Sequence, residues 1–103
     1  MVLLEFAMFP TDKGDSVSEY VSQVIDYIDK SGISYMLTPM GTILEGEWDD
    51  LWNIVDACFK ILEPQSKRIY SSIKIDYRKE RKTGMTSKTA KIKKIIGRDI
   101  TTA

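Results

Sequence analysis

The chain has 103 residues, of which 43% are hydrophobic and 29% are charged, with equal numbers of acidic and basic side chains. This length predicts one domain with a modest core, and the ordinary composition excludes a disordered or fibrous chain. No apolar run reaches the length of a signal peptide or a membrane-spanning helix, and the one cysteine, Cys58, cannot form an intramolecular disulfide, so we expect a soluble protein of the reducing cytoplasm.

The zero net charge hides a difference between two parts of the chain. Residues 1–78 carry 7 basic and 13 acidic side chains, a balance of −6, whereas residues 79–103 carry 8 basic and 2 acidic ones, a balance of +6. No aromatic side chain lies among the lysines of the second part, as stacking on nucleic-acid bases would need. We therefore expect a domain at 1–78 and a basic extension at 79–103 that is solvated or docks on an acidic surface of its own or a neighbouring subunit.

Hydrophobic periodicity and turn signals divide the chain into short elements. Ser16 and Glu19 have the spacing of a capping box, which predicts a helix start, and Gly32 is a suitable left-handed stop. The predicted elements, in order, are a strand at 2–9, a helix from about Ser16 to Gly32, strands at 33–37 and 42–44 joined by a turn at Pro39 to Gly41, a helix opened by Asp49 and Asp50 that ends before Pro64, a strand at 68–77, and a short amphipathic helix at about 86–96.

The order β-α-β-β-α-β followed by a tail helix is that of the ferredoxin-like split βαβ sandwich, an α+β fold. Right-handed crossovers place both long helices on one face of a four-stranded antiparallel sheet. The other face of the sheet is then left without a helix.

Strand alternation predicts which side chains that uncovered face carries. The apolar rows, which include Leu4, Phe6 and Met8, and in the last strand Ile69, Ser71, Ile73 and Ile75, belong under the helices. The uncovered face should present Leu3, Glu5, Ala7, Phe9, Ile43, Glu45, Tyr70, Ser72 and Lys74. This mixture is too apolar to face water as one patch and too polar for an ordinary core, so we expect another subunit, a ligand or both to cover it.

Glu45 is the acid that is hardest to explain, because strand propensity and burial both disfavour a carboxylate there. A carboxylate among apolar side chains needs a partner. Lys74 can pair with Glu5 or with Glu45 across neighbouring strands. The functional alternative is that at least one of these acids faces a cationic or amino-bearing ligand.

The sequence does not favour an enzyme. It contains no histidine, the commonest general base and transition-metal ligand, and Cys58 falls in the apolar stripe of the second helix, where it is expected to be inert core. Gly41 and Gly46 lack the lysine and the spacing of a phosphate-binding loop. Glu5 and Glu45 could mimic a two-carboxylate hydrolase, but so small a chain offers little substrate cleft. We also do not expect nucleic-acid binding, because the predicted sheet lacks exposed aromatic residues in a basic setting.

Several separated motifs carry a family resemblance. They are Met8-Phe9-Pro10, Ser16-Val17-Ser18-x-Tyr20-Val21, Tyr35-x-Leu37-Thr38-Pro39-Met40-Gly41-Thr42-Ile43-Leu44-Glu45-Gly46 and Ser71-Ser72-Ile73-Lys74-Ile75-Asp76-x-Arg78. In this order they resemble the small ferredoxin-like thiamine-binding proteins, long catalogued as conserved proteins of unknown function. The resemblance implies a non-catalytic cytoplasmic protein that needs no cofactor, assembles as a homotetramer (a dimer of dimers) through its sheets, and binds thiamine or its hydroxymethylpyrimidine moiety.

The chemistry of thiamine agrees with a site near Glu45. A carboxylate can accept a hydrogen bond from the aminopyrimidine, hydroxyls can donate or accept, and Tyr35 or Phe9 could stack on either ring. Thr42 must contribute from the turn, because strict alternation places it opposite Glu45. The residues expected at the site are Glu45, Ser72, Thr42, Tyr35, Glu5 and Lys74. The alternatives are a ligand-free structural or regulatory oligomer and, less favoured, a nucleic-acid-binding domain.

Overall fold

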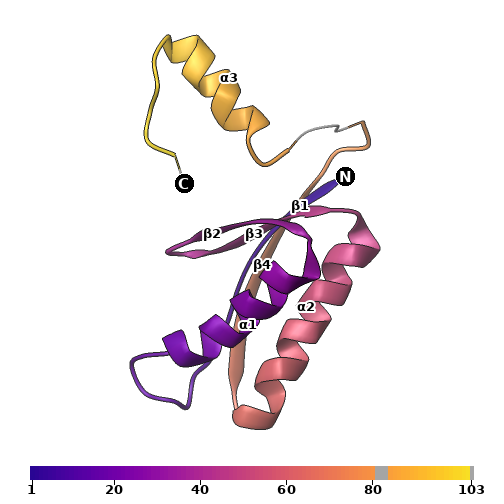
Figure 1. Ribbon diagram of the computed structural model, residues 1–103, viewed down its shortest axis with the longest axis vertical. Helices are drawn as coiled ribbons and strands as arrows, with labels where there is room; N and C mark the ends of the chain where they lie inside the picture. Colours follow the sequence, from indigo (N-terminus) through magenta and orange to yellow (C-terminus); the bar gives the residue numbers. More distant parts are fainter. Residues whose placement is uncertain (81–83, 103) are drawn as a thin grey trace.

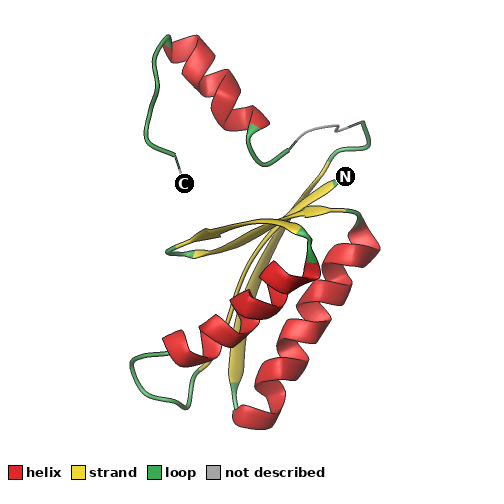
Figure 2. Ribbon diagram, in the orientation of Figure 1, coloured by secondary structure: helices red, strands yellow, loops and turns green. Residues whose placement is uncertain are grey.

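Four strands and two long helices form two layers in the computed structural model, which describes residues 1–80 and 84–102 (Figure 1). The elements are β1 (Val2–Pro10), α1 (Ser18–Ser31), β2 (Ser34–Thr38), β3 (Gly41–Gly46), α2 (Trp48–Leu62), a short 3-10 turn η1 (Glu63–Gln65), β4 (Ile69–Tyr77) and α3 (Ser87–Ile96). The strands lie in the order β2-β3-β1-β4, and each neighbouring pair is antiparallel. This confirms the expected α+β sandwich with α1 and α2 on one face (Figure 2).

The register of the strands sorts the side chains as alternation predicts. Leu4 of β1 lies opposite Leu44 of β3 and Ile75 of β4, on the face covered by the helices. The other face, called the open face below, carries Leu3, Glu5, Ala7 and Phe9 of β1, Ile43 and Glu45 of β3, and Tyr70, Ser72, Lys74 and Asp76 of β4.

The core lies between the helices and the sheet. Alternate residues of β1 and the inner stripes of the two helices are buried, and Leu4, Ile28, Leu44 and Leu51 are fully inaccessible. Cys58 is also fully inaccessible, and burial raises the pKa of its thiol to about 12. A thiol in this setting is an inert core residue, as expected from its place in the stripe of α2.

The start of α1 differs from the prediction. The helix begins at Ser18, with Val17 as its N-cap, and no side chain caps it. The capping box is not formed, because the Ser16 hydroxyl lies 3.1 Å from that of Ser18 and so has a local partner other than a helix amide. The predicted stop is confirmed, since Gly32 has a left-handed conformation with φ of 80°.

The expectation that the helices cover the whole apolar row of β4 is wrong. Ile73 and Ile75 lie on the helix face as predicted, opposite Phe6 and Leu4, yet their side chains are 37% and 39% exposed. The physical reason is that β4 is an edge strand, and the helices pack mainly on β1 and β3. The long edge strand β4 therefore leaves two partly exposed isoleucines at a free edge of the sheet.

The tail helix is confirmed at Ser87–Ile96 and ends at Gly97, which is also left-handed. It stands apart from the two-layer sandwich (Figure 1). No helix in the described part of the chain is long and apolar enough to cross a membrane.

Candidate ligand-binding site

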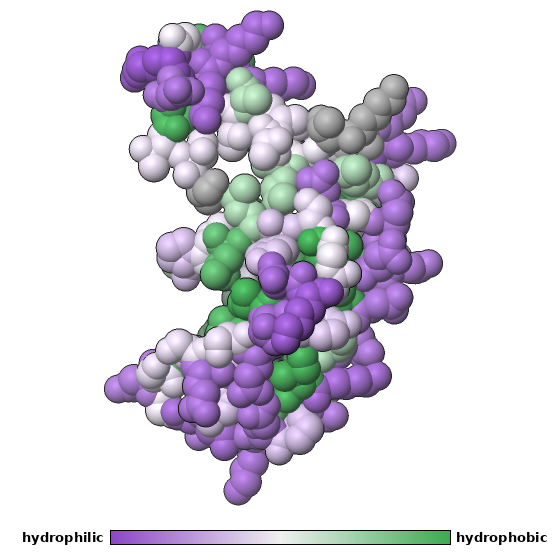
Figure 3. All heavy atoms as spheres, in the orientation of Figure 1, coloured by the Kyte–Doolittle hydropathy of each residue, from purple (hydrophilic) through white to green (hydrophobic). Residues whose placement is uncertain are grey.

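A cavity of about 220 Å³ lies between the sheet, α1 and the β2–β3 hairpin. Its walls are mostly apolar and include Phe6 and Met8 of β1, Val17, Val21, Val24 and Ile25 in and just before α1, and Leu37, Thr38, Met40 and Thr42 of the hairpin. Apolar side chains are visible around this hairpin and α1 in the space-filling view (Figure 3). An apolar pocket with a few polar groups is the usual form of a small-molecule site.

Thr42 brings a polar group to this apolar cavity. It lies in β3 opposite Phe6 and Leu37, and its residue is only 5% exposed. A buried hydroxyl is stabilising only when it has a hydrogen-bond partner. Thr42 is thus suited to hold a ring nitrogen or amino group that enters the cavity.

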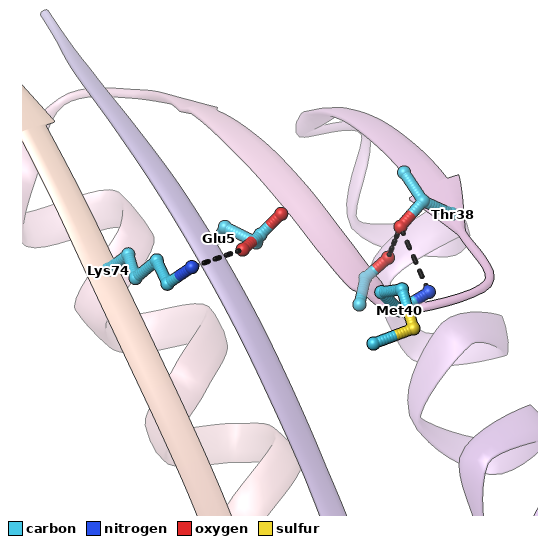
Figure 4. A network of polar contacts seen from close by, with 5 residues as sticks. Glu5, Thr38, Met40 and Lys74 are labelled. Atoms are coloured by element: carbon cyan, nitrogen blue, oxygen red, sulfur yellow. Dashed lines mark hydrogen bonds and ion pairs between the residues drawn. The ribbon is translucent and has the colours of Figure 1, made fainter.

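The turn at the mouth of the cavity is held by its own hydrogen bonds. The Thr38 hydroxyl donates to the Gly41 carbonyl at 2.9 Å and accepts from the Met40 backbone N–H at 3.2 Å (Figure 4). A Cβ at Gly41 would lie 3.0 Å from the Phe6 carbonyl oxygen, so glycine is needed for this close approach to β1. Met40 is 85% exposed and lines the mouth.

The six residues predicted from the sequence do not form one site. Thr42 and Tyr35 lie on the helix face, whereas the other four, which are Glu45, Ser72, Glu5 and Lys74, lie on the open face. The sheet separates the two groups. The expectation that Thr42 reaches Glu45 from the turn is corrected, because Thr42 belongs to β3 and points into the helix layer.

Tyr35 is engaged with α1. Its hydroxyl donates to the Asp29 Oδ1 atom at 2.7 Å, and this hydrogen bond raises the pKa of Tyr35. Together with Leu37, Asp26 and Asp29 it lines a shallow depression that shares Val21 and Ile25 with the cavity. The depression extends the cavity along α1 towards acidic side chains.

On the open face the acids already have partners. The Lys74 Nζ atom lies 3.8 Å from Glu5 Oε1 (Figure 4), which settles the two possible pairings in favour of Glu5. Such an exposed pair contributes at most about 1 kcal/mol. Glu45 instead accepts a hydrogen bond from the Met85 backbone N–H at 2.9 Å. Within the described ranges, no three His, Cys, Asp or Glu side chains are close enough to hold a metal ion.

Comparison with known proteins places the chain in a family. Residues 4–93 match the family described as Thiamine-binding protein. The chain belongs to this family. The match to this thiamine-binding family spans the sandwich and most of α3.

Relatives and solved structures agree with the membership. The chain is 32% identical over 87 residues to the UPF0045 protein MJ1052 of Methanocaldococcus jannaschii, covering 84% of this chain and 87% of the relative. It is 37% identical over 73 residues to a UPF0045 protein of Clostridium perfringens, covering 70% and 77%. The crystal structure of the first relative has a TM-score of 0.77 at 31% identity, covering 93% of this chain and 95% of that one.

A structure from Thermotoga maritima, described as a putative thiamine biosynthesis/salvage protein, has the same fold. Its TM-score is 0.77 at 24% identity, and the match covers 88% of this chain and 97% of that one. The likeness at this identity concerns the fold alone.

Sequence reasoning missed the cavity walls of this thiamine-binding family member. Val21 and Ile25 have the spacing of an apolar helix stripe, which predicts core, yet both are half-buried and line the cavity. The available signal was the number of apolar positions in α1, of which only Val24 and Ile28 are fully buried. The pattern could not show that α1 and the hairpin leave a space between them.

Proposed function

We propose that the protein binds thiamine or its hydroxymethylpyrimidine moiety as a non-catalytic cytoplasmic protein. The observation that carries the proposal is the apolar cavity beside the hairpin, with a buried threonine in its wall. The family membership supports this ligand class. The aminopyrimidine ring is flat and largely apolar on its faces, and its edge offers a donor beside an acceptor, which suits this kind of wall.

The size of the cavity favours one ring rather than the whole vitamin. Pockets that enclose a drug-sized ligand have volumes of roughly 300–1,000 Å³, whereas this cavity has about 220 Å³. In this proposal the pyrimidine enters the cavity and the cationic thiazolium lies outside it, along the depression that contains Asp26 and Asp29. Carboxylates there would favour the positive charge.

Titration calorimetry with thiamine and with hydroxymethylpyrimidine tests the proposal. Thr42→Val keeps the shape of the side chain and removes the hydroxyl, so both ligands should bind roughly two- to ten-fold more weakly if one neutral hydrogen bond is lost. Thr89→Val in α3 is the matched control, since that hydroxyl donates locally to the Thr86 carbonyl, far from the cavity in the sequence. Absence of heat with wild-type protein and either ligand would contradict the proposal.

The open face remains a second candidate location for the ligand. It combines Glu45, Ser72, Glu5 and Lys74 with apolar neighbours, including Phe9 and Tyr70, whose ring centroids are 5.7 Å apart. If the aminopyrimidine binds there, Glu45→Gln should weaken binding about ten- to a hundred-fold, because a charge-assisted hydrogen bond contributes about 1.5–3 kcal/mol. If the cavity is the site, Glu45→Gln leaves the affinity unchanged.

Self-association is the other part of the proposal. A homotetramer would cover the apolar part of the open face and pair the free edges of the sheets, where Ile73 and Ile75 are more than a third exposed. Sedimentation should therefore give a tetramer at micromolar concentration, and a monomer would contradict it. A tetramer that gives no heat with either ligand would favour the ligand-free structural oligomer.

A further inference from the structure

The apolar side of α3 is only partly covered by the described chain. Ile92, Ile95 and Ile96 are 39%, 84% and 43% exposed. The half-buried positions of the helix are polar instead, namely Ser87, Thr89 and Lys93. A helix that docks on its own domain has the opposite arrangement, with the apolar side turned inward.

The beginning of α3 is nevertheless fixed to the sandwich. Gly84 is buried and Met85 is half-buried, and the Met85 N–H donates to Glu45 at 2.9 Å. This bond holds the chain at one corner of the open face, beside Leu3, which lines the same depression as Gly84. The first turns of α3 are thus held beside the sheet, where Lys88 and Lys91 line the same depression, while Ile95 further along the helix is 84% exposed.

Charge complementarity indicates what those isoleucines meet. The segment 87–98 contains Lys88, Lys91, Lys93, Lys94 and Arg98 and no acidic side chain. Among the described residues, the open face carries Glu5, Glu45 and Asp76 along its strands together with Lys74, and Arg78 lies just beyond the end of β4. A basic helix with an apolar stripe therefore matches an acidic sheet face with apolar side chains, and one chain supplies both surfaces.

We propose that α3 packs its isoleucine stripe on the open face of a second copy of this chain, and that the exchange is reciprocal. A two-fold axis then lets each copy offer its helix and receive the other, which closes the assembly. The open face also contains Ala7, Phe9 and Ile43, which are half-buried, and Tyr70, which is 51% exposed. The helix is about 15 Å long and β1 about 30 Å, so one helix fits along this area.

The proposal rests on the self-association part of the proposed function and does not depend on the ligand. Its test uses single cysteines in the full chain, with buried Cys58 left in place and wild type as the blank. Copies with Ile95→Cys and copies with Ala7→Cys are co-expressed and treated with a short bismaleimide. We expect cross-linked dimers containing one copy of each. Lys94→Cys, on the other side of α3, replaces Ile95→Cys as the matched control and should give clearly less dimer.

A double variant with Ala7→Cys and Ile95→Cys in one chain separates the two possible arrangements. An intrachain cross-link without dimer would show docking on the same chain and overturn the proposal. A tetramer by sedimentation without any cross-link between the paired variants would also overturn it while leaving assembly through the sheets intact. A monomer would overturn self-association as well, and calorimetry with thiamine is read independently of all these outcomes.

A charge placed in the stripe gives a second measurement. Ile95→Lys should weaken self-association about ten- to a hundred-fold, because the burial of one large apolar side chain is lost. Ile95 is 84% exposed within one chain, so the variant should fold normally, which circular dichroism checks. Lys94→Ala is the control. Equal dissociation constants for Ile95→Lys and wild type would contradict the helix exchange.

Discussion

The Glu45 carboxylate accepts a hydrogen bond from the Met85 backbone amide at 2.9 Å, which joins β3 to the chain segment that leads into α3. The two residues are 40 positions apart in the sequence. The acid that strand propensity makes hardest to explain therefore has a structural partner in the same chain. This hydrogen bond helps to hold the start of α3 beside β3, and it does so independently of any ligand.

Removing this acceptor should free the start of α3. In Glu45→Ala the Met85 amide loses its partner, so its hydrogen exchange should become faster, and the chain should lose about 1 kcal/mol of stability or somewhat more. Exchange measured by mass spectrometry or NMR checks this. Glu5→Ala removes another acid of the open face and should leave the Met85 amide unchanged; equal protection of that amide in wild type and Glu45→Ala would contradict the role.

The hairpin turn should be sensitive at Gly41. A Cβ there would lie 3.0 Å from the Phe6 carbonyl oxygen, so in Gly41→Ala the backbone of β1 or β3 has to give by a few tenths of an ångström at the cavity. We expect a loss of about 1–3 kcal/mol in the free energy of unfolding and weaker binding of hydroxymethylpyrimidine. Denaturant unfolding and calorimetry measure the two effects. Full stability in Gly41→Ala would show that the strand pair adapts without cost.

The sequence predicted the sheet well because alternation has a fixed period. Glu5, Glu45 and Lys74 were placed on one face, and the register confirms it. Gly32 is predicted as the end of α1 because glycine adopts the left-handed conformation of a helix C-cap without strain, and the structure has it there. These features depend on a few neighbouring residues and can be read from a short window.

The parts that the sequence did not predict depend on distances between elements. The face of Thr42 follows from alternation, but its depth in a cavity depends on how far α1 stands from the hairpin. The Glu45–Met85 bond depends on the path of a distant segment. The capping box at Ser16 had the right spacing, but the helix begins two residues later, and the Ser16 hydroxyl lies beside that of Ser18 instead.

The buried thiol makes stability depend on alkaline pH. In the unfolded chain Cys58 should ionise near its ordinary pKa of about 8.5, whereas in the folded protein its pKa is about 12. The stabilisation that the buried neutral thiol provides is fully present below the pKa of the unfolded chain and is lost as the pH rises towards the pKa of the folded protein. Between them stability should fall by about 1.4 kcal/mol per pH unit from this group.

Denaturant midpoints measured from pH 8 upwards in wild type and in Cys58→Ala isolate this effect, because the other groups that titrate there are common to both. The stability difference between the two proteins should shrink as the pH rises. A difference that stays constant over this range would contradict the burial of the thiol.

The acids beside the cavity should distinguish thiamine from its pyrimidine moiety. Asp29 lies in the depression that continues from the cavity, and its Oδ1 atom accepts from the Tyr35 hydroxyl. Asp29→Asn keeps an acceptor for Tyr35 and removes the charge. Thiamine, which is cationic, should then bind about five-fold more weakly, since a partly solvated charge pair contributes about 1 kcal/mol. Hydroxymethylpyrimidine, which lacks the thiazolium, should bind with unchanged affinity.

The matched control is Asp56→Asn on α2, where the carboxylate pairs with Lys60 at 2.8 Å and does not line the depression. Both ligands should bind this variant as they bind wild type. Calorimetry at low and high salt adds a second criterion, because the thiamine-specific part of the affinity should decrease as salt screens the charges. Equal losses for both ligands in Asp29→Asn would mean that the substitution disturbs the cavity itself, and no loss for either would place the thiazolium away from α1.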